Sequence, residues 1–362
     1  MSKLVIIGAG CSSIYDESVT TIPALKCPVD SNFFSMAKKV IMHASTLTLD
    51  QTIDGIISDI WRLYGPRLRD EKSLGQRFSE ENLSILDQAG LGLENVMTTL
   101  SLEQDLVLKS SQFFGYPTNF IGMDYLAPLK ELIALTISEA LRGPPCKKHK
   151  KLVEGFEKGD IVLSYNYDIL MDRALRNSGK FNDNGYLIPF QKVLVDGAWI
   201  GNNEIDSPIK LLKMHGSLNF IRCSSCFSSL LLRDEKIGDW YSTYPQVCPV
   251  CQREGNLYMQ RLLVPPLLTK NYSDPTIGFV WSEAFRRLQK VDEILVIGYS
   301  LPPTDFASEA LLRASFPFGK HEHIPVTVVD LKEEVANRFK RIFNPANVTW
   351  KTSVDDYLQS LQ

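Results

Sequence analysis

Five short apolar runs, each ending in small or polar residues, stand out in the hydrophobic pattern of this chain. They cover residues 3–7, 160–164, 209–214, 293–297 and 325–329. Apolar runs without alternation are typical of strands buried on both faces, as in a parallel sheet. Helical patterns at 282–288, 308–313 and 333–342 fill the intervals. This alternation predicts an α/β fold built on a doubly wound, Rossmann-like parallel sheet.

Residues 30–155 have a different pattern, with long helical periodicity and no clear strand. The segment 125–141 places apolar residues on one face at a spacing of three to four, and Gly143-Pro144-Pro145 then ends the helix. Segments 35–63 and 93–114 are similar. We therefore predict a helical insertion at 30–155, inside a Rossmann-like α/β domain made of residues 1–29, 156–215 and 262–362.

Size and charge limit the classes of function. The chain has 362 residues, 44% of them hydrophobic, which suits one large domain with an insertion or two domains. With 39 basic and 42 acidic residues its net charge is −3, so direct nucleic-acid binding is not expected. The basic run 147–151 is expected to be a solvated helix start; the alternative is a contact with a phosphate or a partner.

Neither a targeting segment nor a membrane span is expected. The apolar run at 4–7 is too short for a signal peptide, and no stretch approaches the ~20 apolar residues that cross a bilayer. The pattern predicts a cytoplasmic protein without membrane contact. Seven cysteines, an odd number, favour metal binding over disulfides in that setting.

Four of the cysteines form two Cys-x-x-Cys pairs, Cys223 with Cys226 and Cys248 with Cys251. The 21 residues between the pairs slightly exceed the usual zinc-ribbon spacing. Four thiolates can enclose one tetrahedral zinc ion and leave no position open for water. We predict a structural zinc site in a small module at 216–261.

Three further motifs carry candidate chemistry. Gly8-Ala9-Gly10-Cys11-Ser12-Ser13 follows the first apolar run; glycine lets backbone approach a pyrophosphate, and free amides can cradle it. Ser13 replaces the third glycine of a dinucleotide fingerprint, and Asp30 does not follow a helix and a strand, which disfavours an ordinary dehydrogenase. The alternative is a plain strand-to-helix turn.

The second motif ends the run at 160–164, where Asn166 and Asp168 offer donors and acceptors suited to an amide or to ribose hydroxyls. Asp168 could instead cap a helix at 169–176. The third is His215, which ends the run at 209–214 and has a pKa range suited to acid or base work. Its alternatives are a core histidine and a zinc ligand, although four cysteines make a fifth ligand unnecessary.

The order of these motifs resembles the sirtuin family. The resemblance implies a first NAD loop, residues beside nicotinamide, a catalytic histidine, a second phosphate loop and a residue at the adenosine ribose. In that order, the matching residues are Gly8, Ala9, Gly10 and Ser12; Asn166 and Asp168; His215; Gly298, Ser300 and Leu301; and Asp330.

Departures from the family point to a divergent branch. Lysine deacylases carry Gly-Ile-Pro-Asp-Phe-Arg, whereas here Ile22-Pro23 is followed by Ala24-Leu25-Lys26, and 263–268 replaces their Phe-Gly-Glu segment. The segment through Trp281, the segment 298–305 and the helical insertion look more like bacterial sirtuin-like domains that hydrolyse NAD, often in antiphage defence. Most of those lack zinc knuckles, so the deacylase alternative stays open.

The resemblance implies an NAD glycohydrolase that releases nicotinamide and ADP-ribose, with NAD as substrate, structural zinc, and a role as a defence effector. The alternatives are an NAD-dependent protein lysine deacylase and a non-catalytic module that senses NAD or ADP-ribose. Because an uncontrolled NAD hydrolase is toxic, we expect a homo-oligomer or a regulatory protein partner, such as an ATPase or a sensor of a nucleotide signal.

Overall fold

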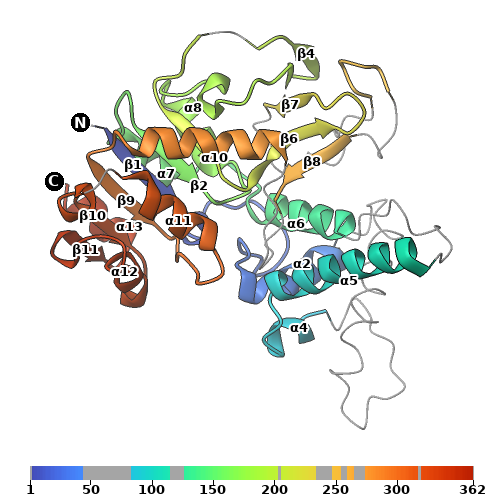
Figure 1. Ribbon diagram of the computed structural model, residues 1–362, viewed down its shortest axis with the longest axis horizontal. Coiled ribbons are helices and arrows are strands. Elements are labelled where there is room, and N and C mark those ends of the chain that lie inside the picture. The colour runs from blue at the N-terminus through green and yellow to red at the C-terminus, as the bar shows by residue number, and fades with distance from the viewer. Residues whose placement is uncertain are drawn as a thin grey trace. The chain divides into compact units, whose positions relative to one another are not determined.

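The computed structural model describes two compact units of the chain (Figure 1). One is formed by Met1–Ser18, Gly143–Val264 and Asn271–Gln362, and the other by Val19–Arg142 and Pro265–Lys270. The residues described are 2–43, 83–114, 126–202, 205–233, 247–253, 259–264, 274–316 and 319–361.

The first unit is built on a sheet of six parallel strands, which confirms the predicted doubly wound fold. Its spatial order is β5-β2-β1-β9-β10-β11. The chain builds outward from β1 in one direction and then, from β9 on, in the other, so the order reverses between β1 and β9. The strands are β1 (Lys3–Ile7), β2 (Ile161–Ser164), β5 (Lys210–Lys213), β9 (Glu293–Ile297), β10 (Val326–Val329) and β11 (Val348–Lys351).

Five of these strands correspond to the five predicted apolar runs, and β11 was not predicted. It is an edge strand in which Val348 alone is fully buried, so it presents no continuous apolar run. In β1, by contrast, every residue after Lys3 is buried. The pattern therefore found the central strands, which are covered on both faces, and missed the edge.

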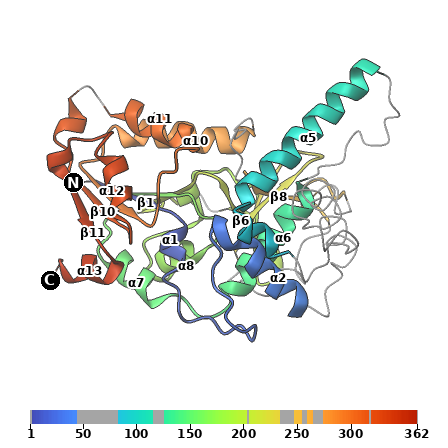
Figure 2. The same cartoon turned by 90° about the horizontal axis from the view of Figure 1, so that it is seen from below.

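Helices cover both faces of this sheet, as Figure 2 shows. On one side are α10 (Pro275–Leu288) and α11 (Phe306–Ser315), and on the other α7 (Lys147–Glu154) and α8 (Leu170–Asn177). Helix α10 buries Ile277, Val280, Ala284 and Leu288, a spacing of three to four that turns one face to the core. The short helices α12 (Glu333–Phe339) and α13 (Val354–Gln359) follow β10 and β11.

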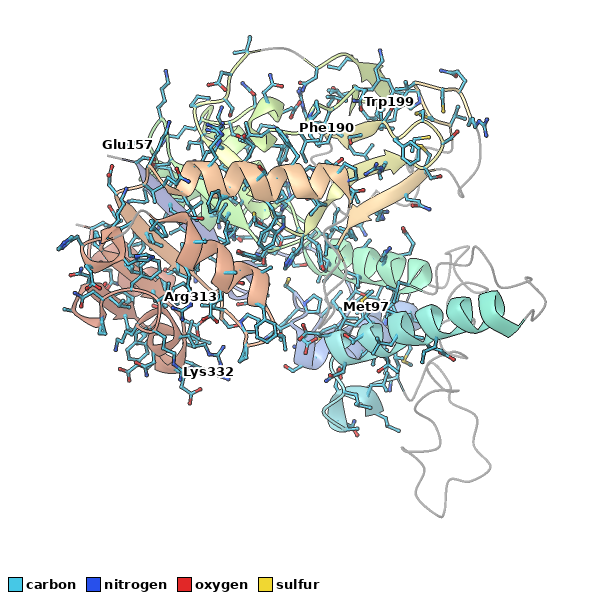
Figure 3. All side chains as sticks on the ribbon, in the orientation of Figure 1. Met97, Glu157, Phe190, Trp199, Arg313 and Lys332 are labelled. Atoms are coloured by element: carbon cyan, nitrogen blue, oxygen red, sulfur yellow. The ribbon has the colours of Figure 1, made fainter. Side chains whose placement is uncertain are left out.

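A second, largely antiparallel sheet belongs to the same unit and has the order β4-β3-β7-β6-β8. Figure 3 labels Phe190 and Trp199 in this region. Strand β6 begins directly after His215, so that histidine lies at the junction of the two sheets. The strands are β3 (Lys192–Val195), β4 (Ala198–Ile200), β6 (Gly216–Cys223), β7 (Ser229–Leu232) and β8 (Met259–Leu263).

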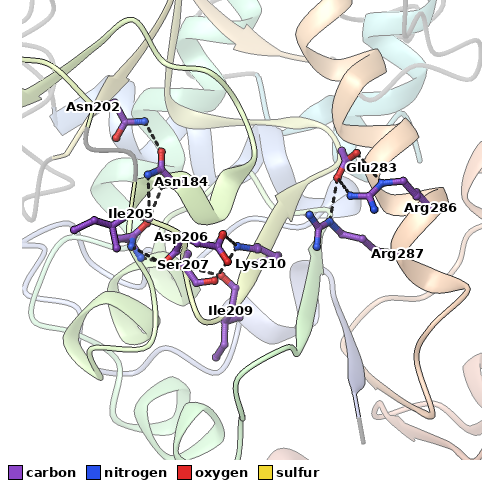
Figure 4. A network of polar contacts seen from close by, with 11 residues as sticks. Asn184, Asn202, Ile205, Asp206, Ser207, Ile209, Lys210, Glu283, Arg286 and Arg287 are labelled. Carbon is purple, nitrogen blue, oxygen red and sulfur yellow. Dashed lines mark hydrogen bonds and ion pairs between the residues drawn. The ribbon is translucent and has the colours of Figure 1, made fainter.

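Polar contacts hold the chain at the amino-terminal end of β5 (Figure 4). The Lys210 ammonium pairs with Asp206 and donates to the Ser207 carbonyl at 2.8 Å. Hydrogen bonding from Lys210 lowers the pKa of Asp206. The Ser207 hydroxyl donates to the Ile209 carbonyl at 2.8 Å. These contacts fix the entry of the strand whose other end leads to His215.

The regular secondary structure among the described residues of the second unit is helical. Its helices are α2 (Phe33–His43), α4 (Ile85–Gln88), α5 (Leu93–Phe114) and α6 (Ala127–Ala140). The predicted helices at 93–114 and 125–141 are confirmed, and the predicted helix at 35–63 is present up to His43, beyond which it lies outside the described residues. None of the helices in the described part of the chain is long and apolar enough to cross a membrane.

The turns that follow β1 and β9 meet backbone to backbone at the point where the strand order reverses. The Gly8 amide donates to the Ile297 carbonyl at 3.1 Å, and the Gly10 amide to the Gly298 carbonyl at 2.9 Å. A Cβ on Gly298 would lie 2.3 Å from the Cys11 amide nitrogen, in a residue whose φ is +59°. The contact therefore requires glycine twice over, for its backbone angle and for its lack of a side chain.

We predict that Gly298→Ala destabilises the protein more than Gly179→Ala does. Gly179 has a similar φ of +71° but open space around it, so its substitution carries only the left-handed penalty of about 1–2 kcal/mol. The overlap at Gly298 should add at least about 2 kcal/mol to that cost. Urea unfolding of both variants measures the difference, and equal losses of stability would contradict the close-contact account.

Candidate active site at the carboxyl ends of the strands

A chain of buried hydrogen bonds joins the turn after β1 to the turn after β2. The Asn166 side-chain amide donates to the Gly8 carbonyl at 2.8 Å and to the Ser12 hydroxyl at 2.7 Å. Ser12 in turn donates to Asp168 Oδ2 at 2.5 Å. All three side chains are buried. The structure thus brings together Gly8, Ser12, Asn166 and Asp168 from two separate predicted motifs.

Asp168 serves a local and a longer-range role together. Its Oδ1 accepts the amide of Leu170, the first residue of α8, at 2.9 Å. Its Oδ2 accepts the Ser12 hydroxyl from the neighbouring turn. The helix-start contact that the sequence offered as an alternative is therefore present alongside the link to the glycine turn, and both carboxylate oxygens are engaged.

His215 lies in the turn between β5 and β6 and is 7% exposed. Its carbonyl accepts the Val264 amide at 2.9 Å. Its ring meets the edge of Tyr165, with centroids 5.2 Å apart, and Tyr165 stacks on Tyr299 at 4.1 Å. Tyr165 follows β2 and Tyr299 follows β9, so this aromatic contact joins three strand ends. Burial raises the pKa of both tyrosines, which keeps their phenols neutral.

The second glycine turn continues from β9 into Ser300 and Leu301. The Gly298 amide donates to the Val329 carbonyl at 2.9 Å, which attaches this turn to the end of β10. The Ser300 carbonyl accepts Arg338 Nη1 at 2.7 Å. Leu301 is buried and has a φ of +43°.

Asp330 is the first residue after β10, the next strand out from β9. Its Oδ1 accepts the Lys332 amide at 2.9 Å, and its carbonyl accepts the Trp350 indole N–H at 2.8 Å. These bonds hold the residue that follows β10 on the same carboxyl edge as the two glycine turns.

Three amides of the first glycine turn are already committed. Gly8 and Gly10 donate to the second turn, and Cys11 donates to the Gly8 carbonyl at 2.8 Å. The expectation of free amides in this loop does not hold for these three. The exposed Ser13 is committed as well, since its amide donates to the Ala9 carbonyl at 3.0 Å and its hydroxyl to the Gly10 carbonyl at 2.8 Å.

The motifs singled out in the sequence did not include one buried charge that lies beside this cluster. Lys213, the last residue of β5, is 1% exposed and donates to the Asp168 carbonyl at 2.5 Å. It also pairs with Asp172 at 3.4 Å. The available signal was a lysine two residues before His215, within a run whose other members, apart from Lys210, are apolar, since lysine is almost never fully buried unless it is paired.

A thiol–imidazole contact lies behind the first glycine turn. Cys11 Sγ and His149 Nε2 are 3.4 Å apart, and both side chains are buried. Burial raises the pKa of the Cys11 thiol, and the charge of Asp168 raises it further, so the thiol stays protonated. Burial lowers the pKa of His149 to about 4. The solvated helix start expected for 147–151 is thus wrong for His149, which faces the core while its lysine neighbours are exposed or half-buried.

The four cysteines of the two Cys-x-x-Cys pairs come together at the end of β6 and before β8. Their sulfur atoms all lie within 4.8 Å of one another, and the group contains no histidine. Two of the cross-pair distances are 3.8 Å, between Cys223 and Cys251, and 3.7 Å, between Cys226 and Cys248. Tetrahedral zinc with Zn–S bonds of about 2.3 Å requires S–S separations of about 3.8 Å, so this group could hold zinc.

We predict that the protein loses stability in mild acid through His149. The pKa of its imidazole is near 6.5 in the unfolded chain but about 4 when folded, so the unfolded state binds more protons between these values. Stability should therefore be complete above pH 6.5 and fall by up to about 3 kcal/mol as the pH drops toward 4. Urea unfolding at pH 7 and pH 5 should show a smaller loss for His149→Gln; the same loss in both proteins would refute this assignment.

We predict that the purified protein carries one zinc ion per chain and that Cys251→Ser loses it, because the closed site needs four thiolates. Cys27→Ser serves as the matched control, since Cys27 lies outside the cluster and should leave the zinc content unchanged. Elemental analysis of the three proteins gives the answer. A wild-type protein that binds no added zinc would rule out the site.

No protein-family model and no curated protein sequence match the chain. Solved structures do match. One is Sir2 in complex with the inhibitor EX-527, 2'-O-acetyl-ADP-ribose and a deacetylated p53 peptide, with 12% identity, a TM-score of 0.39, and coverage of 99% of this chain and 92% of that one. A structure concerning sirtuin substrate affinity has 14% identity, a TM-score of 0.38, and coverage of 100% and 93%. A Sir2 homologue mutant in complex with ADP ribose has 13% identity, a TM-score of 0.39, and coverage of 99% and 90%. The chain is thus similar to Sir2 structures over nearly its full length, at low sequence identity. What the site can do follows from the strand order and the contacts of this chain.

Proposed function

We propose that this protein is a sirtuin-like hydrolase that cleaves NAD to nicotinamide and ADP-ribose. The observation that carries the proposal is the position of the buried Asn166–Ser12–Asp168 chain. It lies beside the two glycine turns at the reversal of a doubly wound sheet. In such sheets dinucleotides bind in the crevice beyond the carboxyl ends of the strands, at the reversal point.

The reaction breaks the bond between nicotinamide nitrogen and ribose carbon and passes through an oxocarbenium-like state. Water supplies the hydroxyl group of ADP-ribose, nicotinamide leaves as a neutral base, and one proton is released. A suitable site must orient the nicotinamide, stabilise positive charge on the ribose and position one water. Binding the rest of NAD tightly can drive the strain at the reacting bond.

Asn166 is suited to orient the nicotinamide carboxamide or the attacking water. Its Nδ2 already donates to Gly8 and Ser12, which leaves its Oδ1 to accept a hydrogen bond from substrate or water. The Asp168 carboxylate supplies negative charge close to a cationic ribose and can accept from nicotinamide or ribose. His215 acts as general base toward a ribose hydroxyl or the water. In this proposal Gly8, Ala9, Gly10, Ser12, Gly298, Ser300 and Leu301 line the phosphate site. Gly8, Gly10 and Gly298 contribute through close backbone approach, because their amides donate to other carbonyls. Asp330 accepts from the adenosine ribose.

Zinc in the four-cysteine cluster would be structural, because four thiolates complete its coordination and leave no site for water. Strand β6 leads from His215 directly to Cys223, so the cluster fixes the far end of the strand that begins at the histidine. The chemistry of the reaction falls to the side chains at the strand ends.

The retained cysteine cluster favours a second candidate, an NAD-dependent protein lysine deacylase. That reaction needs a binding segment for an acylated peptide, and the residues at 263–268 differ from the segment that deacylases carry. Most of that stretch lies outside the described residues. A non-catalytic sensor of NAD or ADP-ribose would bind the same ligands without turnover.

The proposed activity also implies control. Depletion of NAD harms the cell that carries it out, so a cytoplasmic defence effector of this kind needs a homo-oligomer or a regulatory protein partner to hold it inactive. The helical unit is the surface we propose for that assembly, because the residues of the proposed site all belong to the other unit.

We predict that the purified protein releases nicotinamide and ADP-ribose from NAD in the absence of any peptide. His215→Ala and Asn166→Ala should each lower turnover at least about 100-fold, the scale of a lost general base or positioning group. Zinc content should not change in either variant. His323→Ala is the matched control, since that histidine is exposed and should keep full activity.

Equal activity in wild type and His215→Ala would reject the assigned role of the histidine. If nicotinamide appears only after an acylated peptide is added, the deacylase candidate replaces the hydrolase. Binding of NAD without turnover under either condition would support the sensor.

A further inference from the structure

The buried ammonium of Lys213 is the least expected charge in the first unit. Lys213 ends β5 and is 1% exposed, and it comes two residues before His215. Removing an ammonium group from water costs several kcal/mol, which only good geometry and further hydrogen bonds can offset. The partners of the Lys213 ammonium show which groups its charge holds in place.

The closer of these two partners of Lys213, Asp168 and Asp172, contributes a backbone carbonyl. The Lys213 Nζ donates to the Asp168 carbonyl at 2.5 Å, whereas its distance to Asp172 Oδ2 is 3.4 Å. The carboxylate of Asp172 is 0% exposed and compensates the buried charge. The hydrogen bond to the carbonyl, by contrast, holds the turn that carries Asn166 and Asp168.

A second layer fixes Asp172 itself. The Tyr186 hydroxyl donates to Asp172 Oδ1 at 2.6 Å, and Asn219 Nδ2 donates to the same hydroxyl at 3.2 Å. Burial raises the pKa of Tyr186, so its hydroxyl remains a neutral donor. Its ring is held edge-on by three aromatic neighbours, Phe181, Phe190 and Phe220.

These contacts connect the two parts of the proposed site. Lys213 belongs to the strand that leads to His215, and Asp168 belongs to the turn that carries Asn166. The Asp168 carbonyl is held by Lys213, while its carboxylate is held by Ser12 and by the Leu170 amide. Lys213 therefore links this turn to the strand end that carries the histidine.

We propose that Lys213 is a positioning residue, which sets Asn166 and Asp168 at their working distance from His215, and that Asp172, held by the Tyr186 hydroxyl, balances its charge. The inference rests on the proposed hydrolysis of NAD. A purely structural ion pair would behave differently, because replacing both partners of a buried pair with neutral groups is often neutral or stabilising. Neutralising both Lys213 and Asp172 separates the two roles.

The test compares Lys213→Met, Asp172→Asn and the double variant with the wild-type chain. Lys213→Met should lose thermal stability and turnover, because it removes the ion-pair partner of the buried Asp172 and the donor to the Asp168 carbonyl. The double variant should regain most of the melting temperature. Its kcat should stay about 10- to 100-fold below wild type with KM for NAD changed less than about 3-fold, since the Asp168 carbonyl still lacks its donor. Recovery of kcat together with stability would overturn the proposal.

Arg176→Met provides the matched control. Arg176 lies on the same helix as Asp172 and interacts with its charge, but its ion pair is with the buried Asp183 at 3.0 Å, whereas Lys213 is the donor to the Asp168 carbonyl. This variant should lose stability while the folded enzyme keeps its kcat. A fall in kcat as large as in the double variant would show that any damage to this helix slows turnover, and would overturn the specific role of Lys213.

Amide hydrogen exchange tests the same inference without turnover. The Leu170 amide donates to Asp168, and the Leu218 amide donates to the Tyr167 carbonyl at 2.9 Å, so both report on the turn. The double variant should lose protection at both amides relative to wild type. If the wild type fails to release nicotinamide, the proposed function fails, while exchange still decides on Lys213; unchanged protection would reject the positioning role.

Discussion

The close approach of two glycine turns is the constraint on which the rest of the site depends. Gly8 and Gly10 lie against Gly298 with no space for a Cβ on any of them. This contact brings the ends of β1 and β9 together at the reversal of strand order, where a doubly wound sheet opens its crevice. The contact also engages the amides of Gly8 and Gly10, which a phosphate could otherwise bind. This part of the loop therefore sets the distance between the two turns.

Around that contact, the site is built from polar groups buried in an apolar interior. Unpaired groups there would cost about 1–3 kcal/mol each, so every bond in the Asn166–Ser12–Asp168 chain contributes to both stability and orientation. The buried Lys213 contributes in the same way by donating to the backbone carbonyl of Asp168. The Tyr165 ring packs against His215 and Tyr299 and positions the histidine ring through van der Waals contact. Rigid placement of this kind is what a reaction with a cationic transition state requires.

Much of this arrangement could be predicted from local patterns. Apolar runs revealed five of the six strands in the parallel sheet, because central strands are buried on both faces. They missed the edge strand β11, in which only Val348 is buried. The spacing of the four cysteines was enough to predict that they form one group, since two Cys-x-x-Cys pairs are typical of a zinc site. The pattern could not show that His149 is buried, because lysines surround it in the sequence.

The sequence by itself determined the class of fold, the candidate zinc ligands and the identity of the polar residues at the strand ends. These follow from periodicity and from short motifs, which are local properties of the chain. Only the tertiary structure decided which of those residues touch. The bond from Ser12 to Asp168 and that from Lys213 to the Asp168 carbonyl join segments 156 and 45 residues apart, through the register of parallel strands. Register depends on packing of the whole sheet, and no local pattern contains it.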